Sequence, residues 1–192
     1  MLRGSSAGAA VLSMLVVLGC SDPAAPPPRG SATVQLSSVS PPVSGKSCPS
    51  QGNPIFLGES GVGPSGSAKG KVLTDDEGGA SVSCSISGGD EVKFSGQLKK
   101  AGGFFQVAGT VTKGGSGKAM ISVFDPASTD RLNSPEDAMC DVHVDADPLS
   151  VGDDSIWASY SCPKLLSNEP GASNPNVLCD IDISWFYFDQ CK

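Results

Sequence analysis

From Ser81 onward the chain alternates between apolar and polar residues with a period of two. In SVSCSIS, residues 81–87, Val82, Cys84 and Ile86 share one side and serines occupy the other. A β-strand projects successive side chains to opposite faces, so this alternation predicts strands with one buried face. Similar alternation, or a short apolar run, recurs in the stretches 91–100, 104–112, 118–125, 139–145, 155–162 and 183–189.

Glycine-rich breaks separate these stretches, among them GGD at 88–90, KAGG at 100–103 and KGGSGK at 113–118. Glycine supplies the positive φ angles that tight hairpins need, and strands spaced by about ten residues are typical of an antiparallel meander. We therefore predict an all-β fold, either an antiparallel β-sandwich or a small β-barrel. The one helical signal is SPED at 134–137, which predicts a short turn with acidic residues at its start.

The last predicted strand contains WFYF, residues 185–188, which has no polar face. Strands that are covered on both sides lose their alternation, so we expect this one to be buried on both faces. The alternative is an aromatic groove that binds a ligand.

The N-terminal segment has a different pattern, with Arg3 followed by ten mainly apolar residues from Ala9 to Leu18. A membrane-spanning helix needs roughly 20 apolar residues, so this length indicates a secretory signal. The residues Val17-Leu18-Gly19-Cys20 that end it resemble the lipobox of bacterial lipoproteins. The alternative is an ordinary signal peptide that is cleaved after Ser21.

The resemblance to bacterial lipoproteins implies that residues 1–19 are removed and that Cys20 carries the lipid. A diacyl or triacyl cysteine anchors a protein stably in a membrane. By analogy with the enteric sorting rule, Ser21 after the cysteine implies the outer membrane rather than the inner one. The expected location is thus the bacterial cell envelope.

Residues 20–45 are rich in Pro, Ala, Ser and Gly and have little to bury, so we predict a flexible tether there. A short docked strand at Ala32–Val39 is the alternative within it. The remaining residues, 46–192, suit a single β-domain of ordinary size.

Six cysteines follow Cys20, and an even number in an exported chain predicts three disulfides. We suggest one pairing, Cys162 with Cys179, and leave the others open. The six are Cys48, Cys84, Cys140, Cys162, Cys179 and Cys191.

The only histidine, His143, lies in CDVHVDAD, where Asp141, His143 and Asp145 fall on the same face of a predicted strand. With Asp147 nearby, these side chains are candidate ligands for a divalent metal. Neighbouring side chains on one strand face converge poorly on one ion, so we favour a solvated outer face. We expect no metal and no other cofactor.

The chain carries 20 acidic and 13 basic residues, for a net charge of −7. Such a surface repels phosphate backbones, so we exclude a nucleic-acid partner.

No complete catalytic motif is recognisable. The expected function is a membrane-anchored, non-catalytic binding or structural module whose partner is an envelope or extracellular protein or a glycan. The alternatives are a metal-dependent or hydrolytic enzyme built on Asp141, His143 and Asp145, and a domain that binds a small apolar ligand through aromatics such as Trp157 and Trp185.

Overall fold

The computed structural model describes residues 24–48, 52, 54–58, 72–124, 131–146, 150–167 and 176–192. The lipobox and Cys20 lie outside these residues. The described chain is almost entirely β-structure, and its one helix is a single 3-10 turn, η1 (Glu136–Ala138), at the place predicted from SPED. Within the described residues no helix is long and apolar enough to span a membrane. The strands are β1 (Arg29–Val34), β2 (Ser37–Ser38), β3 (Ile55–Leu57), β4 (Leu73–Thr74), β5 (Ser81–Gly88), β6 (Glu91–Lys100), β7 (Gly103–Thr112), β8 (Ser116–Phe124), β9 (Arg131–Asn133), β10 (Cys140–His143), β11 (Ile156–Leu166) and β12 (Leu178–Asp189).

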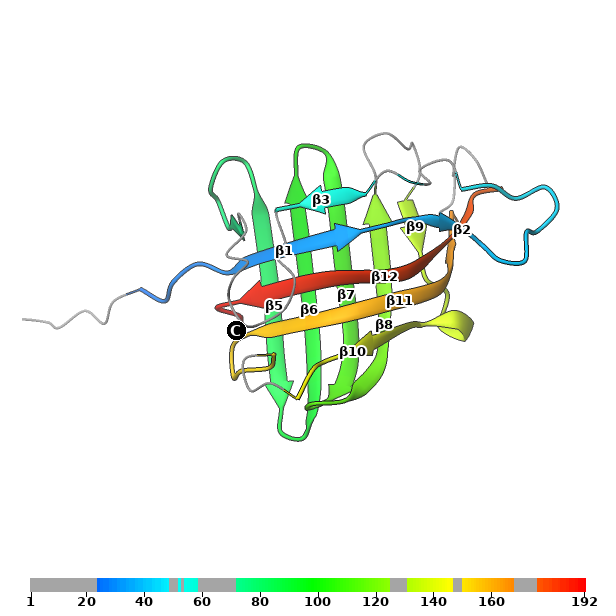
Figure 1. Cartoon of the computed structure of the whole chain (residues 1–192). Helices are drawn as coiled ribbons and strands as arrows, with labels where there is room; N and C mark the ends of the chain where they lie inside the picture. The colour runs from blue at the N-terminus through cyan, green and yellow to red at the C-terminus, as the bar shows by residue number, and fades with distance from the viewer. Residues whose placement is uncertain are drawn as a thin grey trace, which may run out of the picture.

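The strands form two layers that cross each other (Figure 1). One layer is the antiparallel meander β5–β6–β7–β8, and the other contains β1, β12 and β11. β10 pairs with both β8 and β11 and so joins the layers along one side. β9 makes a second link there, because it too pairs with β8 and β11.

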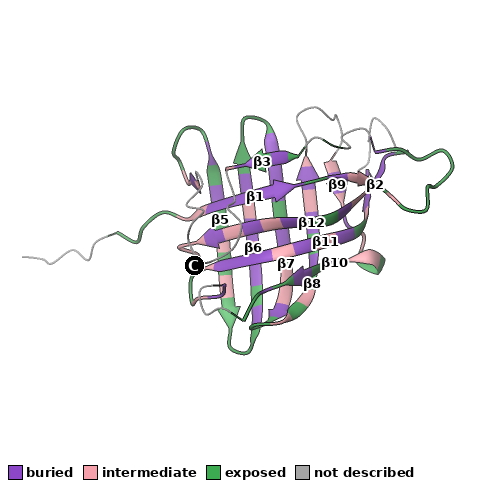
Figure 2. Ribbon diagram, viewed as in Figure 1, coloured by how far each residue is buried: buried purple, intermediate pink, exposed green. Residues whose placement is uncertain are grey.

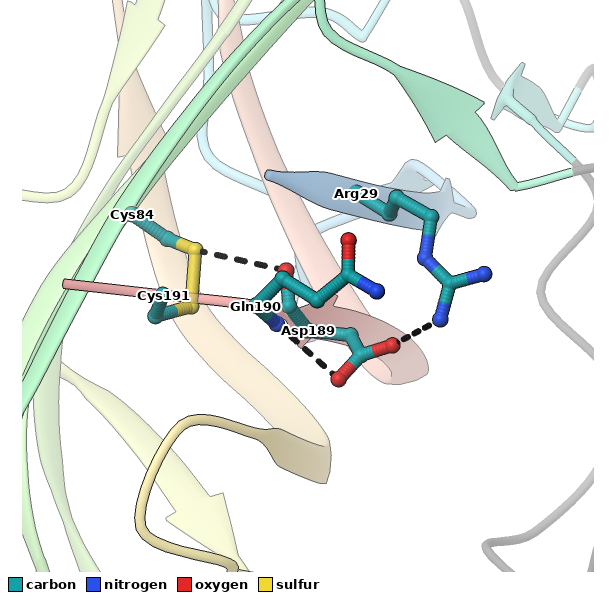
Figure 3. Close-up of polar contacts among 5 residues, drawn as sticks. All are labelled: Arg29, Cys84, Asp189, Gln190 and Cys191. Carbon is teal, nitrogen blue, oxygen red and sulfur yellow. Dashed lines mark hydrogen bonds and ion pairs between the residues drawn. A yellow bond between two sulfur atoms is a disulfide. The ribbon is translucent and has the colours of Figure 1, made fainter. Parts of the chain in front are cut away.

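The opposite side is closed by the C-terminus. The amide of Lys192 donates to the Cys84 carbonyl, and the amide of Ile86 donates to the Lys192 carbonyl. The last residues after β12 therefore pair with the free edge of β5, and a disulfide joins Cys84 to Cys191 there (Figure 3). The ring of strands is thus a small closed barrel with outer strands attached, which confirms the all-β prediction and selects the barrel.

Alternation along the strands generates the core. The residues predicted to face inward on β6 and β7, including Phe94, Leu98, Phe105 and Val107, are buried. Figure 2 shows buried and exposed positions alternating along this meander. The centre of the barrel holds an aromatic cluster in which neighbouring ring centroids are 5.6–6.1 Å apart. Its members are Phe94, Phe105, Tyr160, Phe186 and Phe188.

The β-domain begins earlier than the sequence analysis places it. β1 and β2 lie inside the predicted tether 20–45, and β1 is paired with β12 on one side and with β3 and β4 on the other. Ala32, Val34 and Leu36 are almost fully buried. Three well-buried apolar side chains offset the cost of ordering this short segment, so the docked-strand alternative is the correct one here. The tether therefore ends before Arg29.

All six downstream cysteines form disulfides, as predicted, but the suggested pairing is wrong. The bridges are Cys48–Cys179, Cys84–Cys191 and Cys140–Cys162. Although Cys162 and Cys179 lie on the paired strands β11 and β12, register shifts place Cys162 opposite Ile181 and Cys179 opposite Leu165. Cys162 instead faces Cys140 on β10, one position beyond the pair Asp141–Ser161.

Candidate functional site

The predicted cluster on β10 is partly assembled. Asp141 and His143 share the exposed face of the strand while Val142 between them is buried. The Nδ1 atom of His143 is 3.1 Å from the Ser116 hydroxyl, and its Nε2 atom is 3.5 Å from an Asp145 carboxylate oxygen. Asp141 forms an ion pair with Lys118, at 2.6 Å. Ser116 and Lys118 come from the neighbouring strand β8, and local sequence patterns do not show which strand lies beside β10.

The described members of this cluster do not form a set of metal ligands. Among the described residues, no three potential ligands gather closely enough to hold an ion. Asp141 is neutralised by Lys118, which leaves only His143 and Asp145 in contact with each other. Asp147, the other candidate ligand, lies outside the described residues.

The contacts of Ser116, His143 and Asp145 form a series of a hydroxyl, an imidazole and a carboxylate. In hydrolases the carboxylate of such a series is buried, so that it fixes the tautomer of the imidazole. Here the side chains of His143 and Asp145 are 55% and 54% exposed. Water screens their interaction, and the series is better described as a polar patch on the outside of the barrel.

The WFYF segment divides between two faces of β12. Phe186 and Phe188 point into the core, whereas Trp185 and Tyr187 lie half-buried on the outer face. The expectation of complete burial on both sides is therefore wrong for the outer face. Tyr187 is paired with Trp157 of β11, so Trp157, Trp185 and Tyr187 lie outside the barrel and do not line its interior.

Burial raises the pKa of Tyr187 to about 12, with a further contribution from the negative charge of Asp189. Burial also raises the pKa of Tyr160, whose hydroxyl donates a 2.9 Å hydrogen bond to the Thr33 carbonyl. Both shifts favour the protonated phenol in the folded state. Their contribution to stability is therefore complete below the ordinary tyrosine pKa near 10 and is lost as the pH rises from about 10 towards 12 and beyond.

Because Tyr160 and Tyr187 are the only tyrosines in the chain, this effect can be measured directly. We expect a titration of absorbance at 295 nm to show little phenolate at pH 10 in the folded protein, and about half ionisation at that pH in guanidinium chloride. The midpoint for the folded protein should coincide with alkaline unfolding. A folded protein that ionises normally at pH 10 would contradict these pKa shifts.

A second site, which the sequence analysis missed, lies beside the hairpin that joins β6 and β7. Cross-strand pairing sets four residues in one row across the outer face of the meander, Lys99, Phe104, Phe124 and Arg131. Lys99 and Arg131 both lie over the ring of Phe104, at 5.6 and 4.3 Å from its centroid. With Lys100 and the glycines of the hairpin they line a hollow of about 460 Å³.

One signal for this site was present in the sequence. The strand that follows LKK contains Phe104 and Phe105. If Phe105 faces inward by alternation, Phe104 must face outward. An aromatic ring on the outer face is expected to be covered by other side chains. Identifying Arg131 as one of those side chains requires the pairing register of β9. This strand has only three residues, too few to show an alternating pattern in the sequence.

Comparison with known proteins gives no match: no protein-family model, no curated protein and no solved structure is similar to this chain. The function must be argued from the residues themselves.

Proposed function

We propose that the chain is a lipid-anchored module of the bacterial cell envelope, attached to the membrane through acyl chains on Cys20. Its role is binding or structural rather than catalytic. The main support for the proposal is that six of the seven cysteines form disulfides and the remaining one, Cys20, stands apart from them in the sequence. Six are paired within the β-domain, which is typical of proteins from an oxidising compartment, and the seventh ends an apolar run in a lipobox-like context.

The position of β1 limits how far the barrel can lie from the membrane. Eight residues separate Cys20 from Arg29, and a chain of that length spans about 30 Å when fully extended. The barrel would therefore stay near the membrane surface. The outer membrane is the favoured site, on the analogy that Ser21 provides, and an envelope or extracellular protein or a glycan is the favoured partner.

The experiment that tests the anchor is a Cys20→Ser variant in the native bacterium. We expect the wild-type protein to enter the detergent phase in Triton X-114 partitioning and to incorporate an alkyne-labelled fatty acid. The variant should do neither, because serine lacks the thiol that accepts the lipid.

A Ser21→Asp variant is the matched control. It keeps the thiol, so it should still partition into detergent and incorporate label, but it should move from the outer to the inner membrane fraction. A Cys20→Ser protein that partitions like the wild type would overturn the proposal.

A further inference from the structure

We propose that the hollow beside the β6–β7 hairpin binds a small ligand through a phosphate or carboxylate group. This inference names a ligand class for the binding role proposed above, but it does not depend on lipidation of Cys20.

The aromatic ring of Phe104 holds two cations of this row in place. Phe104 lies on the outer face of β7 yet is only 6% exposed, because neighbouring side chains, including Lys99 and Arg131, cover it. Cation–π contacts restrict both side chains and hold their charges near the hollow. Charges that are already positioned lose less entropy when an anion binds.

The distribution of charge in the protein also favours an anion at this hollow. The protein has a net charge of −7, and its other cations include Arg29 and Lys118, which pair with acidic side chains. No carboxylate among the described residues forms an ion pair with Lys99 or Lys100. Lys99 and Lys100 therefore place two such cations at one hollow in an acidic protein, and nearby positive charges attract an anion to it.

The size and chemistry of the hollow also suit a charged group. Its volume of about 460 Å³ lies within the roughly 300–1,000 Å³ of small-molecule sites, but it is open to solvent, so it would hold the charged part of a ligand rather than enclose the whole molecule. Arginine offers a planar fork of donors, and lysine a point charge, and both match phosphate and carboxylate oxygens. Gly79, Gly102 and Gly103 line the rest of the wall and have no side chain to block it. Sugar phosphates and sugar acids are small molecules that carry these groups.

The test uses the full-length protein in detergent and three probes of similar size: glucose 6-phosphate, glucuronate and uncharged glucose. Binding is measured by calorimetry at fixed ionic strength. We expect saturable binding of at least one of the two anions, and none of glucose. Saturation by only one of them identifies which oxyanion the site accepts.

The variants Lys99→Gln, Lys100→Gln and Arg131→Gln should each weaken binding about tenfold, as expected for loss of a charge-assisted contact. Lys100→Gln is included because Lys100 makes no contact with the Phe104 ring that would affect folding. The matched control is Lys93→Gln, which removes the same charge from an exposed position on the same strand and face, and it should change affinity less than twofold.

Two results would overturn the inference. One is the absence of saturable binding of both anions to a folded wild-type protein. The other is an equal loss of affinity in Lys93→Gln and Lys100→Gln, which would mean that overall charge rather than this hollow attracts the anion. Either result would leave the anchor untouched, because partitioning into detergent tests that separately.

Discussion

Replacing Cys84 and Cys191 together by serine should lower the free energy of unfolding by about 2–5 kcal/mol. The bridge joins residues 107 positions apart, and closing a loop of that length removes much of the conformational freedom of the unfolded chain. Both cysteines are only partly buried, so serine replaces them without burying a new polar group in the core. The loss should therefore come mainly from the missing cross-link.

The position of this bridge predicts where the variant loosens first. It holds the C-terminal residues against β5, where Lys192 and Ile86 make the two hydrogen bonds that close the barrel. Asp189 stands beside it, paired with Arg29 and with its carbonyl oxygen near the Cys84 sulfur, as Figure 3 shows. In the variant we expect faster amide hydrogen exchange at Ile86 and Lys192, with little change in β7.

Denaturation in guanidinium chloride without reductant measures the loss of stability. An Asp189→Asn variant is the control for the neighbouring ion pair. Arg29 is 38% exposed and Asp189 is 15% exposed, so water screens the pair only in part, and its loss should cost less than loss of the bridge. If the double serine variant unfolds at the same denaturant concentration as the wild type, the bridge does not stabilise the barrel in the way argued here.

The parts of the fold that the sequence predicts are those set by local alternation. The meander β5–β8 and its glycine turns follow from period-two patterns that span whole strands. β1 was harder to recognise, because its burial on both faces removes the alternation and its proline-rich neighbours suggest a tether. Its place depends on pairing with β12, more than 150 residues away in sequence, as in the pair Arg29–Asp189.

The candidate sites illustrate the same limit. The sequence placed Asp141 and His143 on one exposed face correctly. It could not show that β8 would supply Lys118 to neutralise Asp141, since that contact depends on which strand lies beside β10. The cationic row from Lys99 to Arg131 depends on the register of three strand pairs, and the disulfide partners of Cys162 and Cys179 depend on the irregular pairing of β11 with β12. Composition and spacing carry none of this information.

The second large loss of stability is expected on replacement of Gly96, in the middle of β6. A Cβ atom added there would lie 2.3 Å from two atoms of the Phe188 ring, far inside van der Waals contact. Phe188 is buried and packs on Phe186 with ring centroids 6.0 Å apart, and it lies so close to Gly30 that a Cβ atom added there would also be 2.9 Å from its ring. The ring therefore has little room to move, and Gly96→Ala should cost about 1–3 kcal/mol through overpacking.

Chemical denaturation of Gly96→Ala tests this expectation, with Gly89→Ala as the control. Gly89 also lacks a positive φ, and a Cβ atom there would meet nothing within 4 Å, so its replacement should change stability by less than about 0.5 kcal/mol. Adding Phe188→Leu to Gly96→Ala should relieve the clash, so the double variant should lose less than the sum of the two single losses. If the loss of stability in the double variant equals the sum of the two single losses, the crossing of β6 and β12 does not depend on a glycine beneath the Phe188 ring.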